Sequence, residues 1–414
     1  MARMNETLQQ INKLRNIQHS DLAPLVRKVA VVLSSPRSGS SFIKAVLQSH
    51  PEVASLTGEI EPFLVLTQNG FGFNSDSDAI STIANKNELI DNIFDDLTVH
   101  SNVPLPSSFL KHQWERRLLL QYPAFFIHAN RYEHLQASLE DVFRNDHLYE
   151  SDEKELQIKI LTKVYEQEPW RINYYDGYVK RDNEHYFNEL LKIEEPPFVL
   201  PRADRRPFTR EDASNKTLLF KTPPDVFRMG MYEELFPNAH IQYIHLTRGF
   251  AQVVNGLMDG WLSPQGFFSH NMRLHEETLQ IKGYSDTLGF GKDWWKFDLP
   301  PNWREYKTSS LEDVCLNQWA SAQIEILHSK KNILKISFEE FLISPNDVAS
   351  KVTQYLGLKS IELNDDLPIV MATETPKKKR WEKRKALLLQ MAEREEVRDL
   401  MQILDYSMKP ETWI

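Results

Sequence analysis

The 414-residue chain contains a single cysteine, Cys315. One cysteine cannot form an internal disulfide, which is typical of a protein in a reducing compartment, so we expect a cytoplasmic location. A basic excess is also missing, because the formal charge is -9 at pH 7. Surfaces that follow nucleic-acid phosphates usually need such an excess, and we therefore expect no nucleic-acid partner.

Long apolar runs are absent too. No stretch reaches the roughly 18 consecutive apolar residues of a spanning helix, and the N-terminal segment lacks the apolar run of a signal peptide. Residues 1–27 instead carry Leu8, Ile11 and Leu14 at three-residue steps. This spacing predicts an N-terminal helical extension packed on the rest of the protein, and we expect no membrane partner.

Hydrophobic residues make up 41% of the chain, which is enough for a large core. Short apolar runs predict buried strands at 28–33, 217–221, 241–246 and 333–338. The first run is followed by a small-residue turn and by an apolar helical pattern at 42–48. This alternation predicts an α/β fold with a central parallel sheet flanked by helices, in a domain spanning 28–414.

Two segments depart from this alternation. Residues 75–215 are acidic and aromatic without a strand pattern, and predict a mostly helical insertion. Residues 261–306 are rich in aromatic side chains among glycines and prolines, and predict a long ordered loop that either lines an apolar pocket or covers the sheet. A tail follows, with seven basic residues among 377–385 and a charged helix to about Asp405.

The turn at 34–41, Ser-Ser-Pro-Arg-Ser-Gly-Ser-Ser, is the strongest candidate binding element. Backbone amides in a small-residue turn at a helix start favour anions. Against the nucleotide-binding pattern G-x-x-x-x-G-K-[ST], Ser34 replaces the first glycine and Ser40 the lysine. The missing lysine disfavours the alternative of a P-loop nucleotide kinase or NTPase. Arg37 lies inside the turn, where its guanidinium group suits phosphate or sulfonate oxygens.

This turn resembles the 5′-phosphosulfate loop of sulfotransferases that use 3′-phosphoadenosine-5′-phosphosulfate (PAPS). The family pattern P-[KR]-S-G-[ST]-[ST] is matched by Pro36, Arg37, Ser38, Gly39, Ser40 and Ser41. The resemblance implies a P-loop-like sulfotransferase fold and PAPS as cofactor with 3′-phosphoadenosine-5′-phosphate (PAP) as product. The 75–215 insertion is not matched by the family's motifs, and we expect it to lie on the acceptor side. The family resemblance also implies a site without metal, and the sequence has neither an H-E-x-x-H motif nor a cysteine pair.

Two further segments resemble the family's 3′-phosphate site. Arg248 ends a predicted strand at the family's arginine position, whereas Gly256 stands where the family has serine, with Asn255 beside it as a possible substitute. The family's basic C-terminal segment is matched by Lys379, Arg380 and Trp381. Phe338 occupies a position where tyrosine is common. These departures keep open the alternative of a non-catalytic nucleotide-binding interaction protein.

The resemblance also implies catalytic residues. Lys221 matches the family's strand-end lysine, which implies that it stabilises charge on the leaving group together with Arg37. Pro223 replaces the histidine that serves as base in many members. Members without that histidine often use a glutamate after the phosphate loop, so we expect Glu59 to be the general base, with Glu61 as the alternative.

The acceptor is expected to be a small molecule of specialised metabolism that carries a hydroxyl or an amine. No basic stripe suited to a polyanion occurs outside the tail. The sequence does not distinguish O-sulfation from N-sulfation.

Overall fold

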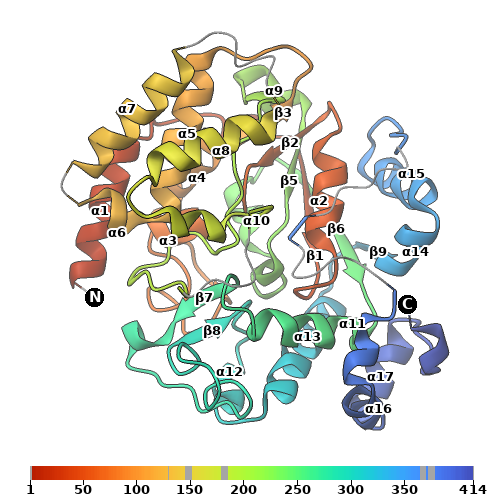
Figure 1. The fold of residues 1–414 in the computed structure, drawn as a ribbon. Helices are drawn as coiled ribbons and strands as arrows, with labels where there is room; N and C mark the ends of the chain where they lie inside the picture. Colours follow the sequence, from red (N-terminus) through yellow and green to blue (C-terminus); the bar gives the residue numbers. More distant parts are fainter. Residues whose placement is uncertain are drawn as a thin grey trace.

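A seven-stranded sheet runs through the centre of the computed structural model, which describes residues 2–128, 130–144, 152–178, 185–363, 370–371 and 378–413 (Figure 1). In spatial order the strands are β4 (Arg205–Pro207), β3 (Leu97–His100), β2 (Val53–Leu56), β5 (Thr217–Phe220), β1 (Lys28–Leu33), β6 (His240–Thr247) and β9 (Ile333–Ser337). The five strands β2, β5, β1, β6 and β9 are parallel to one another. At the edge beyond β2, strand β3 pairs antiparallel with β2, and β4 pairs antiparallel with β3.

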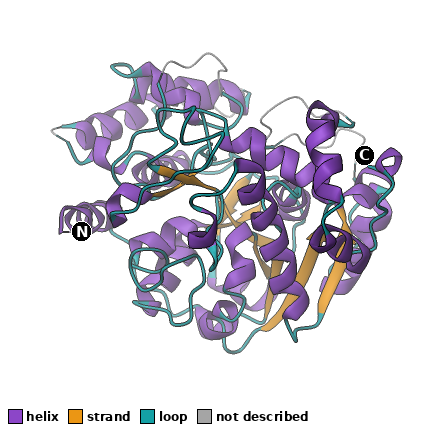
Figure 2. Cartoon of the chain, turned by 90° about the horizontal axis from the view of Figure 1, so that it is seen from below, coloured by secondary structure: helices purple, strands orange, loops and turns teal. Residues whose placement is uncertain are grey.

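Helices lie on both sides of this sheet, as Figure 2 shows from below. The central strand β1 is therefore buried from Val29 to Leu33, and such a strand appears in the sequence as a continuous apolar run. All four strands predicted from apolar runs form, with ends that differ by at most one residue. The predicted α/β class is confirmed.

The antiparallel edge was not predicted. Strands β3 and β4 belong to the 75–215 segment, so the expected helical insertion also extends the central sheet. Leu97 and Val99 are buried, and Val99 lies opposite Ala54 of β2. Strands of three or four residues are too short for a recognisable alternation, and their pairing depends on residues far away in the sequence.

Outside β3 and β4, the described part of the 75–215 segment consists of helices joined by irregular stretches such as 185–204; residues 129, 145–151 and 179–184 lie outside the described part. Its α-helices are α4 (Lys86–Asp96), α5 (Ser107–Gln121), α6 (Pro123–Phe126), α7 (Arg131–Phe143), α8 (Glu153–Val164) and α9 (Arg210–Asn215). Helix α1 (Ala2–Arg15) packs on α5 and α6 through buried Leu8 and Ile11, as its spacing predicted. Among the described residues, no helix is both long and apolar enough to cross a membrane.

The aromatic segment 261–306 is more regular than the expected loop. It contains a two-stranded antiparallel sheet of β7 (Phe268–Asn271) and β8 (Trp294–Lys296), and the short helix α12 (Trp303–Tyr306). Most of its aromatic side chains form a core: Trp261 and Trp295 are fully buried with ring centroids 5.1 Å apart. The segment is therefore mainly part of the hydrophobic core. Of its aromatic residues, only Phe267 and Phe297 also line the cavity described below.

The C-terminal tail forms two helices where one was expected. After the 3-10 turn η6 (Arg380–Arg384) come α16 (Lys385–Ala392) and α17 (Glu395–Ile403). Trp381 is buried, with its ring centroid 5.0 Å from that of Trp413. The first basic residue of the tail, Lys377, lies outside the described residues.

A buried charge network joins the helical segment to the sheet. Arg117 of α5 donates to Glu194 and lies 3.5 Å from Asp96 at the end of α4. All three residues are at least nine-tenths buried. A Cβ added at Gly58 would lie 2.7 Å from the Arg117 guanidinium group, so this network also fixes the chain that follows β2.

We predict that Arg117→Met destabilises the protein by about 3–5 kcal/mol, because two carboxyl groups then remain buried without their cation. Urea unfolding followed by circular dichroism measures the change. The matched control is Arg398→Met, which removes an exposed ion pair with Glu393 and should cost less than about 1 kcal/mol. Equal losses in the two variants would contradict the structural role of Arg117.

Candidate active site

A cavity of about 640 Å³ opens at the carboxyl ends of the parallel strands. Its walls come from the segments that follow β1, β5 and β2, from the helical segment, from the aromatic segment and from the C-terminal part. Crevices at this end of an open parallel sheet are the usual ligand sites of α/β proteins. The predicted loop residues Pro36, Arg37, Gly39, Ser40 and Ser41 all line the cavity.

The loop between β1 and α2 (Ser40–Gln48) has two left-handed backbone positions, Arg37 with φ 64° and Gly39 with φ 92°. A Cβ added at Gly39 would overlap the ring of Phe338, so glycine is required there for both reasons. Ser38 faces away from the cavity, and its hydroxyl lies 2.7 Å from that of Ser35.

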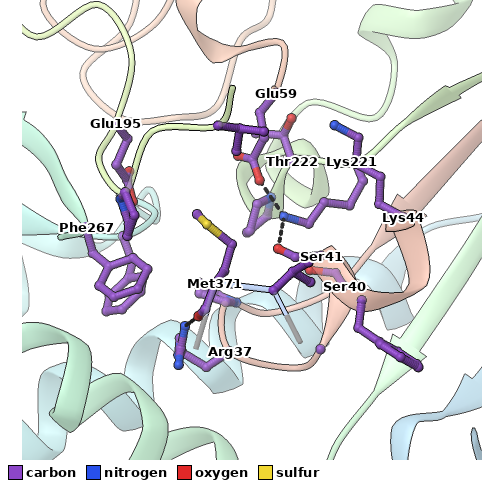
Figure 3. A pocket seen from close by; sticks show the side chains of 18 of the residues that line it. Arg37, Ser40, Ser41, Lys44, Glu59, Glu195, Lys221, Thr222, Phe267 and Met371 are labelled. Atoms are coloured by element: carbon purple, nitrogen blue, oxygen red, sulfur yellow. Dashed lines mark hydrogen bonds and ion pairs between the residues drawn. The ribbon is translucent and has the colours of Figure 1, made fainter. Parts of the chain in front are cut away.

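Three arginines from distant parts of the chain converge beside this loop. Arg248 donates to the backbone carbonyl oxygen of Arg37 at 3.0 Å. Arg37 in turn donates to the backbone carbonyl oxygen of Met371 at 2.9 Å (Figure 3). Burial, together with the charges of Arg248 and Arg380, lowers the pKa of Arg37 to about 10. Burial also lowers the pKa of Arg248, with a further contribution from Arg380. A bound anion would relieve this crowding of positive charge.

The basic C-terminal segment is anchored to α11 (Phe250–Trp261) by Asp259. Arg380 donates to Asp259 at 2.9 Å, and Arg384 donates to Asp259 at 2.7 Å and to Asn255 at 2.6 Å. Arg380 lines the cavity, whereas Asn255, Gly256, Lys379 and Trp381 are not among the described residues that do so. Nucleotide contacts by these four residues stay predictions.

Gly256 has a packing role that the sequence did not reveal. A Cβ added there would lie 3.3 Å from the Cβ of Arg37, which is a tight contact. A larger side chain at this position would push against Arg37, so the glycine holds space for the loop arginine.

Lys221, at the end of β5, connects the loop to the chain after β2. Its ammonium group donates to the Ser41 hydroxyl at 3.1 Å and to the Glu59 carboxylate (Figure 3). Lys221 is buried, while the Glu59 side chain is 35% exposed at the cavity. The structure therefore brings Lys221, Ser41 and Glu59 together, as the sequence motifs implied.

Glu61 has a different environment, although it also lines the cavity. Its carboxylate accepts a hydrogen bond of 2.8 Å from Arg228, which is fully buried and also donates to Asp225 at 3.0 Å. Burial lowers the pKa of Arg228, but the carboxylates of Glu61 and Asp225 more than offset this and raise it overall. Glu61 thus takes part in a structural ion pair.

Sequence reasoning missed Lys44, a buried residue of α2 that lines the cavity. Its ammonium group donates to the carbonyl oxygens of Gly58 and, at 3.4 Å, of Thr57. Burial lowers the pKa of Lys44 to about 7. A lysine inside an otherwise apolar helical pattern is the signal that could have drawn attention to it.

The individual residues of the cavity wall formed by the helical and aromatic segments were not predicted either. Figure 3 shows Glu195 and Phe267 across the cavity from Lys44 and Lys221. Glu195 accepts a hydrogen bond from the Ser269 hydroxyl, and burial, partly offset by Lys192, raises its pKa to about 7. No motif marks these residues in the sequence, because only the fold brings them to one wall.

We predict that Glu195 makes stability depend on pH. The pKa of its carboxyl group is about 7 in the folded protein against 4.5 ordinarily, so the folded state holds this proton more tightly than the unfolded chain. The associated stabilisation is complete below the unfolded pKa and is lost as the pH rises through about 7. Glu195→Gln, which stays neutral, should therefore gain roughly 1–3 kcal/mol over the wild type between about pH 5 and pH 8.

Chemical denaturation of both proteins at several pH values measures this difference. The control is Glu393→Gln, which changes an exposed side chain and should follow the wild type throughout. Parallel stability curves for Glu195→Gln and the wild type would contradict the assigned environment of Glu195.

No family model matches this chain, and no curated protein does. Solved structures that match it include a sulfotransferase domain from the curacin biosynthetic pathway, at 15% identity over 92% of this chain and 99% of that chain, with a TM-score of 0.37. A sulfotransferase from Alicyclobacillus acidocaldarius matches at 10% identity over 92% of this chain and 97% of that chain, with a TM-score of 0.34. The sulfotransferase domain of the Synechococcus PCC 7002 olefin synthase matches at 15% identity over 82% and 76%, with a TM-score of 0.30. These three structures are sulfotransferases, the family that the sequence motifs resemble.

Proposed function

We propose that this protein is a sulfotransferase that moves a sulfuryl group from PAPS to a hydroxyl or amine of a small-molecule acceptor. The observation that carries the proposal is the convergence of four cationic side chains on one glycine-containing loop at the strand ends: Arg37, Lys221, Arg248 and Arg380. Both ends of a nucleotide bisphosphate need such charges, and the loop and Lys221 supply one set while Arg248 and Arg380 supply the other.

Unused hydrogen-bonding groups support an anionic ligand here. Among the described residues, the buried Nε of Arg248 and the buried hydroxyl of Ser34 have no hydrogen-bond partner. Buried polar groups are rarely left unpaired, because losing water without a replacement is costly. Arg248 lines the cavity, so phosphate or sulfonate oxygens bound there would provide an acceptor for its Nε. The residues present therefore fit the proposed nucleotide.

When bound, PAPS would supply an activated sulfuryl group with a nucleotide leaving group. Such a transfer depends mainly on positioning and on stabilisation of charge. Lys221 is placed for the second task, because its ammonium group already contacts the loop through Ser41. Arg37 and the loop amides would orient the anion.

Glu59 is the better candidate for the general base. It is at the cavity surface and shares Lys221 with the loop, so an anion bound at the loop would compete with Glu59 for the ammonium group. A carboxylate oxygen of Glu59 would then be available to accept the acceptor's proton. Glu61, in contrast, is held by Arg228.

We predict that PAP binds in the micromolar range and that Arg37→Ala and Arg248→Ala each weaken binding by about 10–100-fold. Each variant removes charge-assisted hydrogen bonds, which typically contribute about 1.5–3 kcal/mol. Isothermal titration calorimetry measures the affinities. Arg394→Ala is the control, because Arg394 pairs with Asp313 at the surface. Wild-type affinity in both loop-side variants would contradict the assigned phosphate sites.

We predict that Glu59→Gln lowers turnover by about 10²–10⁴-fold while PAP affinity stays nearly unchanged, since glutamine keeps the shape but accepts no proton. Glu61→Gln should lose much less turnover and should instead lower the thermal stability, because Arg228 is left with one carboxylate fewer. Turnover is followed by mass spectrometry with PAPS and an acceptor found by library screening. Full turnover in Glu59→Gln with collapse in Glu61→Gln would reverse the assignment.

A further inference from the structure

The acceptor end of the cavity contains a buried carboxyl group that nothing in the protein uses. Asp298 follows β8, lines the cavity and is only 2% exposed. Its carbonyl oxygen is fixed by hydrogen bonds from Trp295 at 2.9 Å and Gln318 at 2.7 Å. Neither oxygen of its side chain has a hydrogen-bond partner among the described residues. Burying such a group without a partner is costly, which points to a ligand that completes it.

The acids around Asp298 add negative charge. Burial, together with the charges of Asp78 and Glu195, raises the pKa of Asp298 well above its ordinary value. Asp78 is itself paired with His270, whose Nε2 lies 3.2 Å from the Asp78 carboxylate, and Glu195 accepts from Ser269. These two acids therefore have partners of their own, and Asp298 remains as the group available to a ligand.

An aromatic wall lies beside this carboxyl group. The rings of Phe267 and Phe297 stack with centroids 4.6 Å apart, and both line the cavity. Both residues have left-handed backbones, with φ of 61° and 62°, which bulky side chains adopt only at a cost of about 1–3 kcal/mol each. Strain of this kind, repeated in two stacked residues, is typical of a binding wall.

Phe267 also connects this wall to the nucleotide end. The guanidinium carbon of Arg37 lies 5.0 Å from the centre of the Phe267 ring. A ligand lying along the two rings would therefore extend from the phosphate loop towards Asp298. The Phe267 ring thus contacts both the Arg37 guanidinium group and the Phe297 ring, and Asp298 directly follows Phe297.

We propose that the acceptor carries a protonated amine that pairs with Asp298, while its apolar body lies against Phe267 and Phe297. This inference rests on the proposed function in so far as the ligand is the sulfuryl acceptor. An ammonium group donates to the unpaired carboxyl oxygens, offsets the charge of Asp78 and Glu195, and is attracted by aromatic faces. The amine is an anchor, and the sulfated group is a second nucleophile of the same molecule near Lys221.

Other ligand chemistries fit less well. A neutral hydroxyl would satisfy one carboxyl oxygen but would not offset the negative charges of Asp78 and Glu195. An anionic group would add to these negative charges. A metal ion has no support either, because the described residues contain no group of three or more histidine, cysteine or acidic side chains arranged to hold one.

Three phenols that differ only at the end of a short side chain test the proposal: tyramine, its neutral analogue para-propylphenol and its anionic analogue para-hydroxyphenylpropionate. Each is titrated by calorimetry into the free protein and into the PAP complex. We expect tyramine to bind at least about tenfold more tightly than para-propylphenol, and the anion to bind most weakly. Equal binding of the first two, tightest binding of the anion, or no binding of any of the three would overturn the proposal.

Asp298→Asn should abolish the preference for tyramine, because asparagine keeps the shape but not the charge, and Asp298→Ala should do the same. The matched control is Asp293→Asn in the same segment, whose side chain lies 3.6 Å from Arg273 at the surface and should keep the full preference. A preference that survives in both Asp298 variants would overturn the proposal. Each variant is also titrated with PAP to check that the cavity is intact.

The same titrations separate the two proposals. If the wild type failed to bind PAP, the sulfotransferase function would be wrong, while the tyramine preference of the free protein would still be measured. If PAP bound and the three phenols bound alike, the amine-binding site alone would be wrong.

Discussion

The parallel alignment of β2, β5 and β1 is the constraint on which the candidate site depends. Parallel strands present their carboxyl ends at one edge of a sheet, so residues that are far apart in the sequence emerge side by side. Ser41, Glu59 and Lys221 follow these three strands and meet around one ammonium group. The loop conformation adds to this, because Gly39 lets Phe338 approach the backbone. The aromatic and helical segments then close the cavity over this edge.

Burial has opposite electrostatic consequences at the two ends of the cavity. At the loop, burial and the charges of neighbouring arginines lower the pKa values of Arg37 and Arg248. At the other end, burial raises the pKa values of Glu195 and Asp298. Ligands of opposite charge at each end would offset both shifts. These pKa shifts are a physical reason to expect an anionic ligand at the loop and a cationic ligand group at the acidic side chains.

Two of the departures from the sulfotransferase pattern have structural explanations that concern the same pair of arginines. Gly256, at the family's serine position, packs against the side chain of Arg37. Phe338, at the common tyrosine position, lies over Gly39, and its ring centre is 4.6 Å from the Arg248 guanidinium carbon. Hydroxyl groups are lost at both places, while packing against the arginines is gained. The departures therefore change how the arginines are held without removing them from the cavity.

The sequence by itself determined the parallel core and the loop side of the candidate site. The β1 run, the loop around Arg37 and the strand end at Lys221 are local patterns, and local backbone preferences with short apolar runs suffice to predict them. Only the tertiary structure decided the antiparallel edge, the difference between Glu59 and Glu61, and the acceptor end. Glu61 differs from Glu59 because Arg228 binds its carboxylate. Asp298 is distinguished by its burial near Asp78 and Glu195. In both cases the neighbours come from separate segments of the chain. Such environments depend on long-range packing, which leaves no periodic or motif signal in the residues themselves.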